Sequence, residues 1–318
     1  MNVTVIGCGR WGSLITWYLD SIGHSATLYG RASSSHMQRF ISTRRNDLLE
    51  LPESIRLTTD LSAASDAEVI VISIGSQGLQ GLMDELKPLS LKNKTFVLCM
   101  KGIEIATGRR LSEIVADNMD PSNAVAVWLG PGHVQEFYRG VPNCMVIDSG
   151  SPDVKKRLVD AFSSDLIRFY YGQDLIGNEI GAAAKNVIGI AAGMLDGLNL
   201  SSLKGALMSR GTREVSRLIR AMGGNELSAY GLCHLGDYEA TVFSPYSHNR
   251  MFGELFVSGK TYDQLAEGYY TVKALMNLGE RYGVDLPISA TVYDILYCEK
   301  DAKSALNLLF TRSIKNEF

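Results

Sequence analysis

The chain has 318 residues, of which 46% are hydrophobic and 20% are charged, and its formal net charge is −3. This composition is typical of a folded globular protein long enough for two domains, and it excludes a disordered chain. Acidic and basic residues are interspersed and provide no basic patch, so we expect no nucleic-acid partner.

Strand-like and helix-like patterns alternate through the first half of the chain. Short runs of strand-forming residues cover 3–6, 26–29, 69–74, 95–99, 124–128 and 144–147, and helix-like segments cover 79–86, 111–118 and 154–162. Alternation of this kind predicts an α/β fold, a Rossmann-type doubly wound parallel sheet wrapped by helices.

The first strand runs into a glycine turn, Gly7-x-Gly9-x-x-Gly12, that opens a helix. In that context the spacing predicts dinucleotide binding. Gly7 permits a tight turn, Gly9 lets the backbone approach a pyrophosphate, and Gly12 lets helix and strand pack closely. The helix N-terminus adds partial positive charge for the phosphates. The alternative is a strand-to-helix turn without a ligand.

The second strand ends in Leu28-Tyr29-Gly30-Arg31, without an acidic residue. A site specific for NAD usually carries Asp or Glu there to hold the ribose 2′-hydroxyl, whereas Arg31 can neutralise a 2′-phosphate. We therefore expect NADP, or acceptance of both NAD and NADP, with an exposed surface arginine as the alternative.

Two further features follow strands of this sheet. Lys101 follows the strand at 95–99, at the carboxyl edge where open α/β sheets bind ligands. The turn Gly130-Pro131-Gly132-His133 follows the strand at 124–128 and should reach the same edge. His133 could donate a proton in principle, but beside a glycine turn we expect it to be solvated or structural.

Beyond about residue 174 long helical patterns replace the strands, and Gly223-Gly224, Gly259 and Gly283 act as stops between helices. We predict two domains: a dinucleotide-binding domain over 1–172, and an all-α domain over 173–318 that carries substrate and catalytic residues.

Lys185 is the most informative residue, because it lies in a helix of small and apolar side chains. Gly181 and Gly189 lie one turn before and after it, so one face of the helix has almost no bulk. Either another helix packs closely there and Lys185 extends to water, or a ligand approaches a partly desolvated amine. In the second case burial lowers the pKa of Lys185, as a proton donor working near neutrality requires.

Two later segments concentrate polar groups. Leu232 to Asp237 places a carboxylate just after a glycine, where it could cap a helix. The segment from Ser244 to Gly253 gathers hydroxyl, imidazole, amide and guanidinium groups in a domain otherwise built of amphipathic helices. It predicts a site loop.

Nothing in the sequence indicates export or membrane insertion. Met1 leads into a strand pattern without a basic leader, and no apolar run reaches the roughly 18 residues of a spanning helix. The five cysteines are widely separated and form neither a CxxC pair nor a cluster with histidine. We expect a cytoplasmic protein with reduced thiols, no membrane partner and no metal.

Taken in order, these segments resemble the soluble NAD(P)-dependent glycerol-3-phosphate dehydrogenases over nearly the full length. The matches are Gly7-x-Gly9-x-Trp11-Gly12, Lys101-Gly102-Ile103-Glu104 with Thr107 and Ser112-Glu113, Gly130-Pro131, Lys185-Asn186, Arg210-Gly211 and the segment Gly231 to Asp237. The resemblance implies a two-domain enzyme, commonly a homodimer. Its small-molecule substrates would be dihydroxyacetone phosphate and glycerol 3-phosphate, interconverted with NAD or NADP.

The resemblance also implies roles for single residues. Lys185 would be the general acid/base, polarised and positioned by Asp237 and Lys204. Cofactor contacts are implied for Gly7, Gly9, Arg10, Trp11, Gly12, Arg31, Ser76, Lys101, Val134 and Glu267. Substrate contacts are implied for Lys101, Gly130, Gly132, Lys185, Asp237, Ser247, His248, Asn249 and Arg250.

The chain departs from the family pattern in the substrate loop. Ser247-His248-Asn249 stands where the family has Ser-Arg-Asn, whose arginine serves the substrate phosphate and the cofactor, and Gly132 replaces a small hydroxyl residue. Arg250 or a protonated His248 could take over the phosphate contact. Two alternatives stay open: the same hydride chemistry on a hydroxy or keto compound without that phosphate, and a cofactor-binding protein without turnover.

Overall fold

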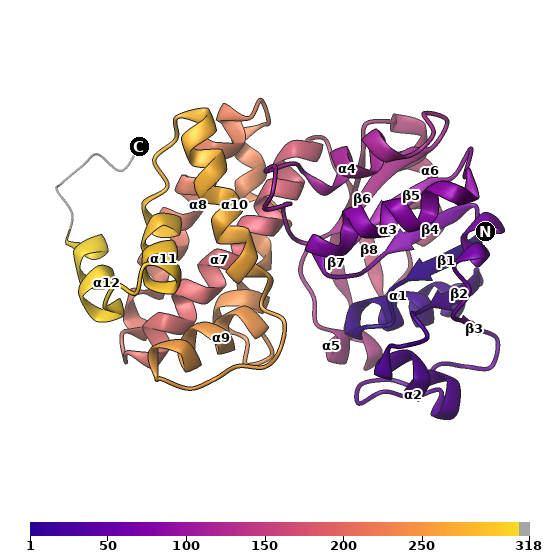
Figure 1. Cartoon of the computed structure of the whole chain (residues 1–318), viewed down its shortest axis with the longest axis horizontal. Helices are drawn as coiled ribbons and strands as arrows, with labels where there is room; N and C mark the ends of the chain where they lie inside the picture. The colour runs from indigo at the N-terminus through magenta and orange to yellow at the C-terminus, as the bar shows by residue number, and fades with distance from the viewer. Residues whose placement is uncertain (312–318) are drawn as a thin grey trace. The chain divides into compact units, whose positions relative to one another are not determined.

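The computed structural model describes residues 1–311, which form two compact units (Figure 1). Unit 1 comprises Met1–Lys101 and Arg109–Glu179, and unit 2 comprises Gly102–Gly108 and the chain from Ile180 onward. The change from unit 1 to unit 2 falls inside one continuous helix, α7 (Leu175–Gly197).

Unit 1 is built on an eight-stranded sheet in the order β3-β2-β1-β4-β5-β6-β7-β8. The strands are β1 (Asn2–Ile6), β2 (Ser25–Tyr29), β3 (Arg56–Thr58), β4 (Val69–Ile72), β5 (Thr95–Leu98), β6 (Ala124–Leu129), β7 (Asn143–Ser149) and β8 (Ile167–Tyr171). The helices and helical turns are α1 (Arg10–Ser21), α2 (Ser35–Thr43), η1 (Leu61–Ser65), η2 (Ser76–Gly78), α3 (Leu79–Leu86), η3 (Lys87–Leu89), α4 (Leu111–Asn118), α5 (Val134–Tyr138) and α6 (Pro152–Phe162).

The predicted doubly wound sheet is confirmed. Its central strands β4 and β5 are buried at every residue, and all of these residues except Thr95 are apolar, so both strands stand out in the sequence as apolar runs. The sheet is parallel except at one place, where β6 and β7 pair antiparallel. The connecting helix α5 has five residues and rises only about 8 Å, well short of a strand's length of about 20 Å. It therefore cannot carry the chain back to the edge where β6 began, and β7 returns alongside β6.

Within the described residues, unit 2 is helical. Its elements are α7, η4 (Ser201–Leu203), α8 (Lys204–Ala221), η5 (Glu226–Tyr230), η6 (Leu235–Asp237), the π-helical turn η7 (Glu239–Phe243), α9 (His248–Val257), α10 (Glu267–Tyr282), α11 (Pro287–Tyr297) and α12 (Ala302–Phe310). The predicted stops are confirmed, because α8, α9 and α10 end just before Gly223, Gly259 and Gly283, which have φ values of 86°, 68° and 65°. No helix in residues 1–311 combines the length and the apolar character needed to cross a bilayer.

The face of α7 that lacks bulk is a packing surface. A Cβ atom built on Gly193 would lie 1.9 Å from the backbone oxygen of Arg250 on α9, and one built on Gly253 of α9 would lie 2.1 Å from the backbone oxygen of Ile190. The two helices therefore cross at backbone contact distance. The expectation of close packing is correct for this face, but Lys185 does not extend to water, since its side chain is only 9% exposed.

Candidate active site

The glycine turn of unit 1 joins β1 to α1 and fits a dinucleotide. Gly7 has a φ of 118°, and a Cβ atom on Gly12 would lie 1.9 Å from the backbone oxygen of Gly7, so both positions require glycine. A Cβ atom on Gly9 would meet nothing within 4 Å, so the backbone there borders open space. The first turn of α1 holds no acidic residue. Open backbone at a helix N-terminus without a repelling carboxylate suits a pyrophosphate.

Arg31 lies just beyond β2 and is bonded to Glu85 at 2.7 Å, with both side chains largely exposed. An exposed pair of this kind is worth about 1 kcal/mol or less, so the guanidinium can exchange its partner for a ligand phosphate at little cost. The geometry is therefore compatible with the expected role of Arg31.

The turn after β6 explains the missing side chain at position 132. A Cβ atom on Gly132 would lie 2.2 Å from the ring of Phe137, which in turn packs on Trp11 with the ring centroids 6.0 Å apart. Phe137 thus occupies the space that a hydroxyl residue would need. In the same turn, the Lys101 Nζ atom donates to the backbone oxygen of Gly130 at 2.7 Å.

The remaining residues of unit 1 with predicted cofactor contacts occupy element ends. Ser76 is buried at the start of η2, and Val134 is buried at the start of α5, directly after its N-cap residue His133. Arg10 is the first residue of α1. Their positions after β1, β4 and β6 are those of residues at the carboxyl edge of the sheet.

In unit 2 the structure brings Lys185 and Asp237 together. The Lys185 Nζ atom lies 2.8 Å from Oδ2 of Asp237, whose side chain is 1% exposed, and it donates to the Thr241 hydroxyl at 2.7 Å. The Thr241 hydroxyl in turn donates to the backbone oxygen of Asp237 at 2.7 Å. The amine is therefore buried with a carboxylate and a hydroxyl that hold it in place. Sequence reasoning missed Thr241, which lies in the π-helical turn η7 and has no motif of its own.

A neutral histidine lies beside this pair. Nδ1 of His234 is 2.8 Å from the backbone oxygen of Gly181, one turn before Lys185, and Nε2 is 2.6 Å from the hydroxyl of Tyr238. Burial lowers the pKa of His234 to about 4, in spite of the hydrogen bond to Gly181. The uncharged ring therefore donates from Nδ1 to Gly181 and accepts at Nε2 from Tyr238.

Lys204, which is buried, belongs to a second network centred on the half-buried Asp196. The Lys204 Nζ atom is 2.5 Å from Oδ2 of Asp196 and 3.0 Å from the backbone oxygen of Val242, and Arg250 reaches the same Asp196 oxygen at 2.7 Å. Burial acts to raise the pKa of Asp196, but hydrogen bonds from Lys204, Ser201 and Arg250 hold it below its usual value. Sequence reasoning missed Asp196, because nothing distinguishes it from an ordinary acidic residue near a helix end.

Asn249 ties α9 to two other helices. Its Nδ2 atom donates to Oδ1 of Asn186, the neighbour of Lys185, at 3.1 Å, and its Oδ1 atom accepts from the backbone nitrogen of Gly268 at 2.9 Å. Gly268 follows Glu267 at the start of α10. The predicted residues Lys185, Asn249 and Glu267 thus come from helices joined by these two hydrogen bonds.

The other substrate-loop residues surround the start of α9. Ser247 is the N-cap and accepts from the backbone nitrogen of Arg250 at 3.3 Å. The Arg250 guanidinium is bonded to two carboxylates, those of Asp196 and Glu254, and to the backbone oxygen of Ser244. His248 Nδ1 is hydrogen-bonded to the hydroxyl of Tyr262.

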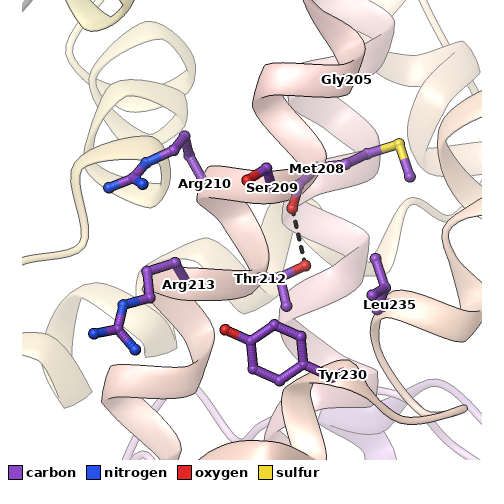
Figure 2. Close-up of a pocket in the computed structure, with 8 residues that line it drawn as sticks. All are labelled: Gly205, Met208, Ser209, Arg210, Thr212, Arg213, Tyr230 and Leu235. Atoms are coloured by element: carbon purple, nitrogen blue, oxygen red, sulfur yellow. Dashed lines mark hydrogen bonds between the residues drawn. The ribbon is translucent and has the colours of Figure 1, made fainter. Parts of the chain in front are cut away.

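A hollow of about 350 Å³ lies on α8 and is lined by Gly205, Met208, Ser209, Arg210, Thr212, Arg213, Tyr230 and Leu235 (Figure 2). Figure 2 shows Arg210 and Arg213 extending to one side of α8, and Thr212 donating to the backbone oxygen of Met208 at 2.9 Å. None of the predicted site residues lines this hollow, so the assignment of the site does not depend on it. In residues 1–311 no three His, Cys, Asp or Glu side chains gather as metal ligands would.

Comparison with known proteins identifies close relatives of the chain. Family models described as NAD-dependent glycerol-3-phosphate dehydrogenase N-terminus and C-terminus match residues 2–155 and 174–307. Glycerol-3-phosphate dehydrogenase (NAD(P)+) of Prosthecochloris aestuarii is 36% identical over 333 residues, with 100% of each chain covered. The protein of that name from a Thermoanaerobacter species is 34% identical over 329 residues, covering 100% of this chain and 99% of its own. The crystal structure of glycerol-3-phosphate dehydrogenase from Coxiella burnetii has a TM-score of 0.91 and 27% identity, covering 98% of this chain and 99% of its own.

Proposed function

The chain belongs to the NAD-dependent glycerol-3-phosphate dehydrogenase family, and on that premise we propose that it interconverts dihydroxyacetone phosphate and glycerol 3-phosphate with Lys185 as general acid and base. The family uses NAD or NADP as its cofactor. One observation carries the assignment within this chain. The Lys185 amine is buried and held by Asp237 and Thr241, as a group that must deliver a proton to a fixed place would be.

The chemistry assigned to Lys185 is proton transfer at the substrate oxygen. The bound nicotinamide would supply the hydride to the carbonyl carbon. The Lys185 ammonium would give a proton to the carbonyl oxygen as that oxygen gains negative charge, and in the reverse direction the neutral amine would take the hydroxyl proton. Asp237 stabilises the ammonium form, and Thr241 fixes the direction of the amine.

We assign Lys204 a positioning role. Its Nζ atom donates to the backbone oxygen of Val242, the residue after Thr241, so the Asp196 network supports the turn that holds Lys185. Lys204 therefore acts through η7.

The other proposed contacts follow the two predicted domains. Over 1–172, cofactor contacts are proposed for Gly7, Gly9, Arg10, Trp11, Gly12, Arg31, Ser76, Lys101 and Val134, and substrate contacts for Lys101, Gly130 and Gly132. Over 173–318, substrate contacts are proposed for Lys185, Asp237, Ser247, His248, Asn249 and Arg250, and a cofactor contact for Glu267. The proposed assembly is a homodimer, which light scattering on the purified protein would test.

A steady-state assay tests the function. Purified protein mixed with dihydroxyacetone phosphate should oxidise NADH or NADPH, and glycerol 3-phosphate with the oxidised cofactor should run the reaction backwards. Absence of cofactor oxidation above background with either NADH or NADPH, at millimolar dihydroxyacetone phosphate, would contradict the proposal.

A second candidate is the same hydride chemistry on a compound without the phosphate. It is favoured by two observations: His248 replaces the family's arginine, and the ring of Phe137 fills the space beside Gly132. A panel of unphosphorylated hydroxy and keto compounds in the same assay separates the two candidates. Only the second predicts turnover of one of these compounds and no turnover of dihydroxyacetone phosphate.

A further inference from the structure

The substrate-loop histidine has a partner that the family pattern does not explain. Nδ1 of His248 is hydrogen-bonded to the hydroxyl of Tyr262, with the two ring centroids 6.1 Å apart. The ring of Tyr262 also packs edge-on against Phe252, one helical turn beyond His248 on α9, with a centroid distance of 6.1 Å. Packing and hydrogen bond together hold the tyrosine hydroxyl at Nδ1.

This contact determines what His248 can offer to a ligand. A neutral imidazole has one N–H donor and one acceptor nitrogen. If the Tyr262 hydroxyl donates to Nδ1, the ring proton resides on Nε2, and the edge of the ring turned away from Tyr262 presents an N–H donor. An N–H donor of fixed direction suits a phosphate oxygen, and it does not require the histidine to be charged.

His248 begins a helix that adjoins the Lys185 segment of α7. Asn249 bonds to Asn186, and a Cβ atom built on Gly189 would lie 3.3 Å from Cβ of Asn249. In dihydroxyacetone phosphate the phosphorus is three bonds from the carbonyl carbon. A substrate whose carbonyl oxygen meets Lys185 and whose phosphate points toward α9 would place that phosphate at the first turn of α9, where the helix dipole also favours an anion.

We propose that Tyr262 is a positioning residue which, by donating to Nδ1, makes neutral His248 the donor to the substrate phosphate in place of an arginine. The inference rests on the proposed function. Arg250, the other cation of the loop, already has two carboxylates and a backbone carbonyl as partners. The Arg250 guanidinium would have to give up one of these contacts to bind the phosphate.

The test replaces Tyr262 by Phe, which keeps the ring against Phe252 and removes only the hydroxyl. The KM for dihydroxyacetone phosphate should rise about tenfold, the effect of one hydrogen bond, with kcat and NAD(P)H affinity within about twofold of the wild-type values. The KM for dihydroxyacetone, which has no phosphate, should not change. Tyr282→Phe, on the exposed end of α10, is the matched control and should leave every constant unchanged.

A double-mutant cycle examines the coupling. His248→Gln places an amide N–H near the position of Nε2 without depending on Tyr262, so adding Tyr262→Phe to it should change the KM by less than about twofold. The inference is overturned if Tyr262→Phe leaves the KM for dihydroxyacetone phosphate unchanged, or raises both KM values equally. If Tyr262→Phe does not fold, His248→Gln is compared with His248→Ala, and equal KM values for the phosphorylated substrate overturn the inference. Failure of the wild-type protein to turn over dihydroxyacetone phosphate is a different result, which removes the proposed function itself.

Discussion

Replacing Lys185 by Met separates the stability of the buried ion pair from its chemistry. The methionine keeps most of the apolar bulk and removes the ammonium, which leaves the Asp237 carboxylate, 1% exposed, without its ion-pair partner. Breaking a buried pair by removing one partner costs about 3–5 kcal/mol. With only 9% and 1% of the two side chains exposed, solvent screening reduces this cost little. Urea titration of Lys185→Met should therefore show a loss of that order in the free energy of unfolding.

A second substitution isolates the cause of the loss. In the double variant Lys185→Met with Asp237→Asn, a neutral amide replaces the unpaired carboxylate. About half or more of the free energy of unfolding lost in Lys185→Met should therefore be recovered. Turnover should be absent in both variants, because no group remains to protonate the substrate oxygen. NAD(P)H binding, measured by fluorescence titration, should stay within about twofold of the wild-type affinity.

Lys155 provides a matched control. It pairs with Asp148 at 3.3 Å, with side chains 16% and 2% exposed, in unit 1 and outside every proposed catalytic role. Lys155→Met should lose stability while the folded fraction keeps its turnover. The reasoning is refuted if Lys185→Met unfolds within about 1 kcal/mol of the wild type, since the pair would then not be a buried one. Full activity in Lys185→Met would refute its role as acid and base.

Three further outcomes follow from the same geometry. Gly193→Ala should lower the free energy of unfolding, measured in urea, by about 1–3 kcal/mol, because the added Cβ atom would lie 1.9 Å from the backbone oxygen of Arg250. Unchanged stability would contradict the close crossing of α7 and α9. Burial lowers the pKa of His234 from 6.5 to about 4. Between these two pH values the histidine is protonated in the unfolded chain and neutral in the folded chain. Stability should fall by about 3 kcal/mol between pH 6.5 and pH 4 from this group, and that part of the pH dependence should disappear in His234→Gln. Arg31→Ala should weaken NADPH binding about tenfold or more and leave NADH binding within about twofold of wild type, because the exposed guanidinium contributes to affinity only where a 2′-phosphate is present. Equal losses of affinity for both cofactors would refute a contact between Arg31 and the 2′-phosphate.

Local chemistry made most of the fold predictable. A strand buried on both faces is mostly apolar, as are β4 and the last three residues of β5, and each such run stands out between polar segments. The two strands that escaped prediction are short or partly exposed. β3 has three residues, and β8 alternates buried residues with exposed Arg168 and Tyr170. The direction of β7 could not be read either, because it depends on the short reach of α5 rather than on the strand's own residues.

The candidate site was predictable only in part, because its residues meet through tertiary packing. Lys185 stands out as a cation among small residues, and Asp237 stands out beside a glycine. Asp196 and Thr241 have no such contrast with their neighbours. Asp196 is contacted from α8 and α9, and Thr241 is contacted by Lys185 of α7. The ion pair of Lys204 with Asp196 likewise forms only through tertiary packing. Sequence reasoning therefore singled out the proposed acid and base together with Asp237 and Lys204, and missed Thr241 and Asp196, which contact them.

The glycines of α7 connect packing with function. From the sequence they indicated either a close helix or an approaching ligand, as if these excluded one another. In the structure Gly193 admits the backbone of α9 at Arg250, and Gly189 admits Thr241 and Asn249 side by side. The Thr241 hydroxyl accepts a hydrogen bond from Lys185, and Asn249 follows His248 in the first turn of α9. A side chain at either glycine would push away the elements that carry these groups. The small residues beside Lys185 thus allow close packing, and this packing places the residues proposed to contact the substrate.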